Sequence, residues 1–442
     1  MSLITDNAEK IRDVICYVKR FKNANVVIYI DDRIIDSSLF SSHISDIALL
    51  HDAGLNVVIV PGAKKRIDDV LTQAGIPWKE ENGVRITGEE AIPLIKMAAF
   101  DVSNKIMTAL SGYGITALIG NWVHSRAKGV IQGVDYGTCG EIEKISEDAI
   151  KTVLSSGFIP IFPCIGWSAS GKPYNISSVS LATESAILLK AEKLFFLTPD
   201  YSLSKTDFEI SADIPLTLEG SIPALNLEEL VEFEKQNAKS LHPAMSLLKY
   251  AKKACKNGVT RVHILNGSID GTILCEVFSS LGSGTMIYEN DYGGIRAMKA
   301  DDVSRVLAIM KPFVEKGILL SRDEHNLLEN LENFIVYEID GTIRACASLV
   351  PYCENGKMLQ AEIAGIAVEE KYSHMGIGPK MVSFLLEKAR KQNFKSVFVM
   401  TTQTSDWFEK LGFKTDNVQS VPQKRLALWS EKRGSKVFRI NF

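Results

Sequence analysis

The sequence lacks the cysteine pattern of a disulfide-stapled domain or of a zinc site. Its seven cysteines are scattered over 442 residues, and no two of them form a Cys-x-x-Cys pair. Disulfide frameworks use an even number of paired cysteines, and structural zinc sites use ligand pairs at short spacing. We therefore expect no disulfide framework and no metal site. Unpaired thiols fit a reducing compartment, so the expected location is the cytoplasm.

Long hydrophobic runs and an excess of charge of one sign are also missing. The formal net charge is −3, from 50 basic and 53 acidic residues. The longest apolar stretch, residues 157–167, is broken by Pro160 and Pro163 and is too short to span a bilayer. A balanced charge gives no broad footprint for nucleic acid or anionic lipid. We expect a soluble protein without a membrane or nucleic-acid partner, and the first residues lack the basic and apolar regions of a signal peptide.

The first two-thirds of the chain alternate short apolar runs with helical patterns. The spacing predicts helices at residues 40–53 and 63–74, and strands at residues 25–30, 55–60, 117–119, 159–163, 194–197 and 261–265. Continuous apolar strands separated by helices indicate a mostly parallel sheet that is covered on both faces. The predicted fold class is therefore α/β, and ligands of such sheets bind beyond the carboxyl ends of the strands.

The pattern changes near residues 288–294, a polar stretch that ends in two glycines and is typical of a linker. Beyond it we expect helices at residues 301–316 and 379–392, and strands at residues 333–339, 342–352, 359–368 and 396–400. The first two strands flank Asp340-Gly341, a strong hairpin signal. Mixed antiparallel strands and helices indicate an α+β domain. The predicted organisation is a domain at 1–287, a linker at 288–294 and a second domain at 295–442.

A glycine-bearing loop follows the third strand of this second domain. Gly376 and Gly378 precede Pro379, which suits the first turn of a helix. Free backbone amides and the helix dipole at such a turn can bind a pyrophosphate. An ordinary strand-to-helix turn is the alternative interpretation.

The loop and its surroundings resemble the GNAT acyl-CoA-dependent N-acetyltransferases. The pyrophosphate loop of that family corresponds here to Ser373, His374, Met375, Gly376, Ile377 and Gly378, with Ser373 where a Gln or Arg is usual. The resemblance implies acetyl-CoA as co-substrate, with backbone groups of Ile366, Ala367 and Val368 on its pantetheine arm. It also places Phe408 where many members have a Tyr that reprotonates the CoA thiolate.

Glu362 lies on the third strand between small and apolar residues. A partly desolvated carboxylate there would have a raised pKa and would suit a general base for the acceptor's ammonium group. The alternative is a side chain that points to solvent on an alternating strand. The residues alone favour neither.

Over nearly its full length the chain resembles the bacterial two-domain N-acetylglutamate synthases. The resemblance rests on the order and spacing of several short segments along the chain. Among them are Val58-Ile-Val-Pro-Gly-Ala63, Val84-Arg-Ile-Thr87, Pro173-Tyr-Asn-Ile176 and His263-Ile-Leu-Asn266. It implies a three-layer sheet domain of amino-acid-kinase type followed by the GNAT domain. It also implies acetyl transfer from acetyl-CoA to the α-amine of L-glutamate, the first step of arginine biosynthesis. Acetylation of another amino acid, or an arginine sensor with a degenerate transferase domain, are the alternatives.

The kinase-type domain departs from a working kinase. Where an acetylglutamate kinase has Lys-x-Gly-Gly, this sequence has Asp31-Asp32, and the late catalytic lysine corresponds to Leu247. Two carboxylates repel phosphate where glycine amides would receive it. We therefore predict no phosphoryl transfer and a regulatory role for this domain.

The resemblance also assigns ligand contacts. Arginine as an inhibitory effector would contact His263, Glu276 and Gly282. Glutamate would contact Arg296, Arg433 and Ser435, with a weaker match at Lys357. From the residues alone, a strand-end histidine, a solvated glutamate and surface basic residues are the alternatives. The family also implies a homo-oligomeric ring, with a hexamer as the candidate size, and residues 8–22 have the apolar spacing of an interface helix.

Overall fold

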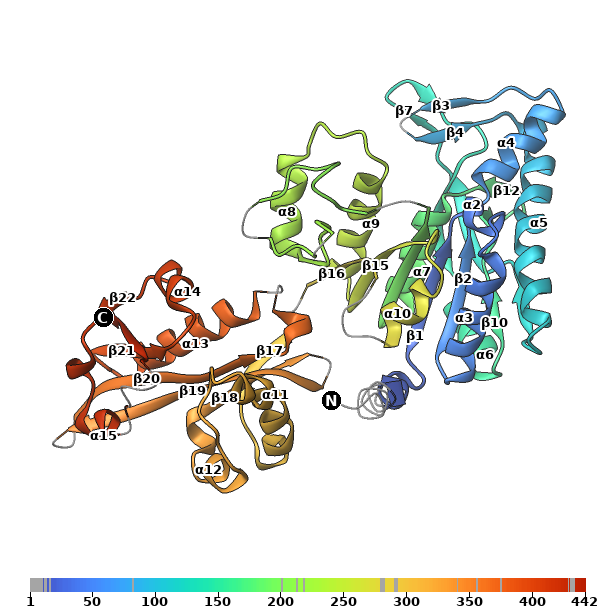
Figure 1. Cartoon of the computed structure of the whole chain (residues 1–442). Helices are drawn as coiled ribbons and strands as arrows, with labels where there is room; N and C mark the ends of the chain where they lie inside the picture. Colours follow the sequence, from blue (N-terminus) through green and yellow to red (C-terminus); the bar gives the residue numbers. More distant parts are fainter. Residues whose placement is uncertain are drawn as a thin grey trace. The chain divides into compact units, whose positions relative to one another are not determined.

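The computed structural model describes residues 11, 14–15, 17–81, 83–199, 202–211, 214–217, 219–278, 283–289, 293–339, 341–354, 357–373, 376–427, 429 and 434–442. The chain divides into two compact units, Met1–Asn290 and Asp291–Phe442. Figure 1 shows that each unit has its own sheet and its own helices. We call them the N-terminal unit and the C-terminal unit.

The N-terminal unit is built on an eight-stranded sheet in the order β14-β16-β15-β13-β1-β2-β10-β5. Neighbouring strands run parallel except β15 and β16, which are antiparallel. The strands are β1 (Asn25–Ile30), β2 (Asn56–Pro61), β5 (Ala117–Ile119), β10 (Ile159–Ile161), β13 (Lys193–Thr198), β14 (Ala224–Asn226), β15 (Arg261–Asn266) and β16 (Thr285–Tyr288). The predicted α/β class with a mostly parallel sheet is confirmed.

Helices cover both faces of this sheet. Along β1, Val26, Ile28 and Ile30 belong to one hydrophobic core and Val27 and Tyr29 to a second core, as the two-residue period of a strand requires. The first core contains residues of α3 (Phe40–Asp52), α4 (Lys64–Gln73) and α5 (Ile92–Ser111), and the second contains residues of α6 (Glu147–Ser155), α7 (Ser178–Leu188), α8 (Leu227–Gln236) and α9 (Ala244–Lys256). The unit therefore has three layers.

The N-terminal unit also contains a smaller sheet and two short hairpins. A four-stranded sheet joins β12 (Pro173–Asn175), β11 (Ile165–Trp167), β6 (Val123–Ala127) and β9 (Gly140–Ile145). The hairpins β3 (Lys79–Glu81) with β4 (Val84–Ile86) and β7 (Val130–Ile131) with β8 (Val134–Asp135) extend from one end of the unit (Figure 1). None of these strands follows from the apolar pattern, because their outer residues are largely exposed.

The C-terminal unit has a seven-stranded sheet in the order β17-β18-β19-β20-β21-β23-β22. Its strands are β17 (Gly293–Ala297), β18 (Phe334–Ile339), β19 (Thr342–Glu354), β20 (Lys357–Val368), β21 (Ser396–Thr401), β22 (Lys414–Asp416) and β23 (Lys436–Asn441), and its helices are α11 (Val303–Glu315), α12 (Glu324–Glu329), α13 (Ile377–Lys391), α14 (Ser405–Lys410) and α15 (Gln423–Leu426). All neighbours are antiparallel except β20 and β21. The predicted hairpin of β18 and β19 is present, and the unit is the expected α+β domain.

Two glycines shape the part of this sheet that faces the candidate site. Gly365 breaks β20 with a φ of +62°, next to a shift in the pairing of β19 with β20. Gly376 precedes α13 with a φ of +65°, and the helix therefore begins at Ile377, two residues before the predicted start. Both values lie in the left-handed region, which residues with a Cβ rarely adopt. The chain thus changes direction just after β20.

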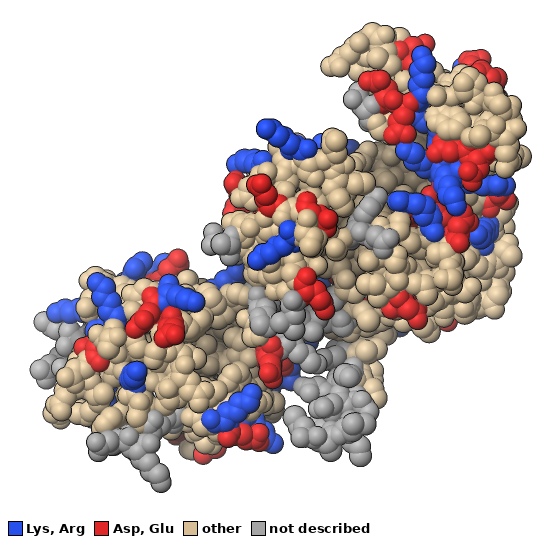
Figure 2. Space-filling view, turned by 45° about the horizontal axis from the view of Figure 1, so that its top comes forward, with Lys and Arg blue, Asp and Glu red and all other residues tan. Residues whose placement is uncertain are grey.

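The surface charges are mixed. On the face shown in Figure 2, basic and acidic side chains are interspersed over both units. This distribution agrees with the near-zero net charge. Among the helices in the described part of the chain, none is long and apolar enough to cross a membrane.

Candidate active site

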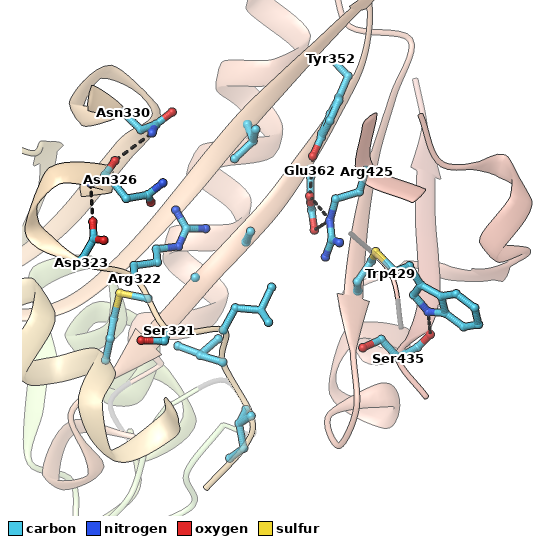
Figure 3. Close-up of a pocket in the computed structure, with 18 residues that line it drawn as sticks. Ser321, Arg322, Asp323, Asn326, Asn330, Tyr352, Glu362, Arg425, Trp429 and Ser435 are labelled. Atoms are coloured by element: carbon cyan, nitrogen blue, oxygen red, sulfur yellow. Dashed lines mark hydrogen bonds and ion pairs between the residues drawn. The ribbon is translucent and has the colours of Figure 1, made fainter. Parts of the chain in front are cut away.

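A pocket of about 500 Å³ opens in the C-terminal unit beside β20 (Figure 3). One wall comes from the segment after α11 and from α12, and the other comes from β19, β20, α15 and the residues before β23. Apolar side chains line much of it, including Met310, Leu319, Leu320, Met400 and Trp429. Polar groups converge on this lining, which is the usual composition of a small-molecule site.

Glu362 lies in the wall of this pocket and is only 5% exposed, so the solvent-facing alternative is wrong. Nε of Arg425 donates to both carboxylate oxygens, at 2.9 Å and 2.8 Å. The hydroxyl of Tyr352 donates to Oε2 at 3.0 Å. Burial, reinforced by Glu362, raises the pKa of Tyr352 above its usual range, so the phenol keeps its proton and stays a donor. A buried carboxylate is thus held by two donors.

Arg322 faces this pair from the opposite wall (Figure 3). Its guanidinium lies over the ring of Phe334, 4.9 Å from the centroid. Within the part of the chain that the structure describes, it has no carboxylate partner. Burial lowers the pKa of Arg322, although an arginine keeps its charge in proteins. No sequence motif indicates this residue, since it lies in an irregular segment between two helices.

Arg296 lies on β17, where its Nη1 pairs with Asp302 at 2.6 Å and its Nε pairs with Glu338 at 2.5 Å. It is not among the described residues that line the pocket, whereas Arg322 is. The role of Arg296 in acceptor binding stays a prediction, and Arg322 is a second candidate for that role.

Of the other predicted acceptor contacts, one lies in the pocket and two cannot be located from the described residues. Ser435 is nearly buried and lines the pocket, and its carbonyl accepts the indole N–H of Trp429 at 3.4 Å. Arg433 lies outside the described residues. Lys357 begins β20, but its side chain lies outside the description. Ser435 is therefore the predicted acceptor residue that the structure brings together with Glu362.

The predicted cofactor segments meet at the same strand. The ladder between β20 and β21 covers only Gln360–Glu362, so Ile366, Ala367 and Val368 lie beyond it. Ile377 and Gly378, both buried, open the 15-residue helix α13, and among the described side chains none caps it. Amides at such a helix start suit a pyrophosphate. Ser373 is exposed and donates to the carbonyl of Glu370, while His374 and Met375 lie outside the described residues.

Phe408 cannot serve as an acid, and its position shows why it is apolar. It is 6% exposed and packs between Trp407 and Phe413 in the core of the unit. Trp407 in turn lies against α13, where a Cβ placed on Gly378 would come within 3.1 Å of the indole. The start of α13 is therefore closely backed by aromatic side chains.

In the N-terminal unit, His263 and Glu276 form a buried pair. Nδ1 of His263 lies 2.6 Å from Oε1 of Glu276, and Oε2 accepts the backbone N–H groups of Ser283 and Gly284 at 2.6 Å and 3.1 Å. Burial lowers the pKa of His263 to about 4, so the ring is neutral at pH 7 and donates from Nδ1. Burial alone would raise the pKa of Glu276, but His263 and the amides lower it. The solvated alternative for Glu276 is therefore wrong, and His263 pairs with a side chain rather than with the backbone. Gly282 lies outside the described residues.

At the end of β1, Asp32 fills the position where a kinase would receive phosphate. Its carboxylate accepts the backbone N–H groups of Lys65 and Arg66 in the first turn of α4. Asp31 caps the short helix α2 (Asp32–Ile35) and pairs with Arg33 at 2.8 Å. Leu247 is buried on α9. Each of these positions argues against phosphoryl transfer.

Each of the two units matches a different known protein family. Residues 4–266 match the amino acid kinase family, and residues 330–415 match the acetyltransferase (GNAT) domain. An amino-acid acetyltransferase of Photobacterium profundum is 31% identical over 95% of both chains, and that of Escherichia coli K12 is 30% identical over 98% of this chain and 97% of its own. The chain belongs to the amino-acid acetyltransferase family. The resemblance inferred from the sequence is confirmed.

Solved structures extend this amino-acid acetyltransferase assignment. N-acetylglutamate synthase of Neisseria gonorrhoeae, in a crystal structure with coenzyme A and L-arginine, is 28% identical over the full length of both chains, with a TM-score of 0.78. A second structure of that enzyme, with coenzyme A and N-acetyl-glutamate, gives a TM-score of 0.60 at 29% identity. The chain is an acetyl-CoA-dependent amino-acid N-acetyltransferase. No group of three or more metal-ligating side chains occurs among the residues described.

Proposed function

We propose that this acetyltransferase moves the acetyl group of acetyl-CoA to the α-amine of L-glutamate, the first step of arginine biosynthesis. The charge pattern of the pocket carries the proposal. Arg322 and Arg425 present two guanidinium groups, and Glu362 presents one carboxylate. Glutamate has two carboxylates and one ammonium group, the complementary set. Guanidinium groups recognise carboxylates in a planar, directional way, which favours a dicarboxylic acceptor.

The chemistry follows from the positions of these groups. Glu362, directly or through a water, takes a proton from the α-ammonium group, and the free amine attacks the thioester carbonyl carbon. The new C–N bond forms, the C–S bond breaks, and the CoA thiolate leaves and takes a proton. Phe408 has no proton to give, so water or another group supplies it. Backbone N–H groups of β20 beyond Glu362, outside its ladder with β21, would polarise the carbonyl, and orientation of the two substrates supplies much of the rate.

The remaining acceptor contacts stay predictions. Ser435 lies in the pocket wall and suits a hydrogen bond to a substrate carboxylate. Arg433 and Lys357 follow from the family resemblance. The N. gonorrhoeae relative with N-acetyl-glutamate bound supports glutamate as the acceptor.

Turnover of acetyl-CoA with a panel of amino acids tests the proposal. We expect glutamate to be preferred over glutamine, aspartate and ornithine, with N-acetylglutamate as the product by mass spectrometry. A stronger preference for another amino acid would replace glutamate as the acceptor. Binding of arginine without turnover of any amino acid would favour the sensor with a degenerate transferase domain.

We further propose feedback inhibition by L-arginine through His263, Glu276 and Gly282. The relative crystallised with L-arginine supports an effector site in this family. Glu276 offers a carboxylate to a guanidinium group, but in this structure the carboxylate is occupied by its own loop and by His263. Arginine binding would therefore require this loop to open. A parent enzyme that is indifferent to millimolar arginine would contradict the proposal.

A homo-oligomer, with a hexamer as the candidate, and a cytoplasmic location also stay predictions. In the predicted N-terminal interface helix, Ile11, Val14 and Ile15 are 59%, 39% and 49% exposed, whereas Phe21 is buried in its own unit. Exposed apolar side chains suit a contact with another subunit. Light scattering on a chain without residues 1–22 tests this, and an unchanged mass would count against an interface there.

A further inference from the structure

The hydrogen bonds of Arg425 leave part of its guanidinium unused. Nε donates to both oxygens of Glu362. Its terminal nitrogens make no hydrogen bond or ion pair within the described part of the chain, although the side chain is only 12% exposed and lines the pocket. The terminal pair is the face that a guanidinium uses for end-on, two-point contact with a carboxylate. Arg425 thus holds one carboxylate and has a free face for a second.

Glu362, in contrast, is engaged on both carboxylate oxygens. One oxygen accepts from Arg425, and the other accepts from both Arg425 and Tyr352. The ammonium group of an acceptor would compete with these donors for the carboxylate. The residue beside the proposed base is therefore also its main competitor for a substrate proton.

From these contacts we propose that Arg425 is a specificity-determining residue that binds a carboxylate of the acceptor through its terminal nitrogens and, in doing so, loosens its hold on Glu362. The inference rests on the proposed function, because it assumes a dicarboxylic acceptor in this pocket. When a substrate carboxylate docks, the charge of Arg425 is shared between two carboxylates. Glu362 then becomes available to the ammonium group. An acceptor without that carboxylate leaves the pair closed and is a poor substrate.

The other described charged and titratable groups that line the pocket are consistent with this role of Arg425. Tyr352 comes from β19 and is a donor. Arg322 faces Glu362 from the far wall and is free to take the other substrate carboxylate. Asp323, the remaining acidic residue of the lining, is turned away, since its Oδ1 accepts the backbone N–H of Asn326 at 2.8 Å at the start of α12. Among the described residues of the lining, no other acidic side chain competes for the free face of Arg425.

A purely structural ion pair is the alternative, because buried pairs often fix only local geometry. The two roles differ in substrate selectivity. A structural pair, when broken, changes folding or the activity toward every acceptor alike. A specificity contact, when broken, changes the ratio of kcat/KM for glutamate over glutamine, because glutamine lacks only the side-chain carboxylate.

The experiment compares Arg425→Gln and Arg425→Lys with the parent full-length enzyme. Lys424→Gln, an exposed position on the same helix, is the matched control. Glutamate, glutamine and acetyl-CoA are each titrated. We expect Arg425→Gln to raise the KM for glutamate about 30-fold or more and to reduce the glutamate-to-glutamine preference by a similar factor. The KM for acetyl-CoA should stay within about twofold of the parent value.

Arg425→Lys keeps the charge, but its single ammonium group lacks the planar pair of terminal nitrogens that contacts a carboxylate at two points. We expect it to lose part of the preference while it folds as the parent does.

An unchanged glutamate-to-glutamine preference in Arg425→Lys, or in a folded Arg425→Gln, would overturn the inference and leave a structural pair. If the parent enzyme itself shows no preference for glutamate, the proposed function fails whatever the variants do. The two failures are therefore distinguishable in one set of measurements.

Discussion

Replacing Arg322 by alanine distinguishes the acceptor site seen in the structure from the one that family resemblance implied. Arg322 lines the pocket and has no carboxylate partner in the described part of the chain, whereas Arg296 is engaged by Asp302 and Glu338. Loss of a charge-assisted pair with a desolvated substrate carboxylate costs about 2–5 kcal/mol. Because Arg322 is only half-buried, we take about 2–3 kcal/mol, which is a rise of about 30- to 150-fold in the KM for glutamate.

Arg296→Ala should behave differently. It removes two ion pairs and leaves the nearly buried Asp302 without its partner, so the free energy of unfolding should fall by about 1–3 kcal/mol. The KM for glutamate should change by less than about twofold, since the residue does not reach the pocket. Arg390→Ala, an exposed arginine on α13, serves as the control for the loss of one positive charge.

The assay follows thiol release from CoA while glutamate is titrated at saturating acetyl-CoA, and thermal unfolding is measured on the same samples. A large rise in KM for Arg296→Ala together with an unchanged KM for Arg322→Ala would refute the reasoning. The acceptor site would then require a rearrangement that frees Arg296 from both of its carboxylates.

Three further predictions concern the cofactor loop, a buried carboxyl group and the effector site. Gly378→Val should sharply weaken CoA binding in calorimetry, because the added side chain presses on Trp407 and projects at the start of α13; unaltered binding in a folded variant would make the loop purely structural. Burial raises the pKa of Asp46 to about 6, so the native state holds an extra proton between about pH 4 and pH 6 and the parent loses stability as pH rises through that window. Asp46→Asn should therefore be more stable than the parent near pH 8 with a smaller gain near pH 4, and equal gains in melting temperature at both would contradict this. Glu276→Gln should weaken inhibition by arginine, measured as the activity ratio with and without the effector; an equally inhibited variant would move the site elsewhere.

The parts of the fold that sequence predicts well are those that the core imposes. β1 is a run of β-branched residues buried on both faces, and its predicted and observed bounds agree. Helix α5 is absent from the prediction, although Pro93 lies in its first turn, where proline suits the start of a helix. Edge strands such as β14 have three residues each, and their partners rather than their composition make them strands.

The residues of the candidate site also differ in how far the sequence predicts them. The small and apolar residues that flank Glu362 on β20 leave open whether its side chain is buried, and the structure buries it. No motif indicates the two arginines of the pocket, because Arg322 and Arg425 lie in an irregular segment and in a four-residue helix, on opposite walls and about a hundred positions apart. Only the tertiary arrangement brings them to one pocket. Arg296 shows the reverse case, where a plausible motif match is satisfied by neighbours that no motif contains.

In the kinase-type unit, a carboxylate of the chain itself occupies the backbone N–H groups that could bind an external anion. The first turn of α4 offers backbone N–H groups to an anion, and Asp32 supplies that anion from within the chain. Burial, and then Asp31, raises the pKa of Asp32 above its usual range, while the amides of Lys65 and Arg66 act in the opposite direction. An external phosphate would have to expel a carboxylate that is covalently tethered beside it, and would meet the charge of Asp31 as well. The carboxylate also joins the loop after β1 to α4, so its removal would loosen the sheet's carboxyl edge without restoring the missing lysine. These contacts weigh against phosphate binding at this edge of the sheet, and they support the regulatory role that we propose for the unit.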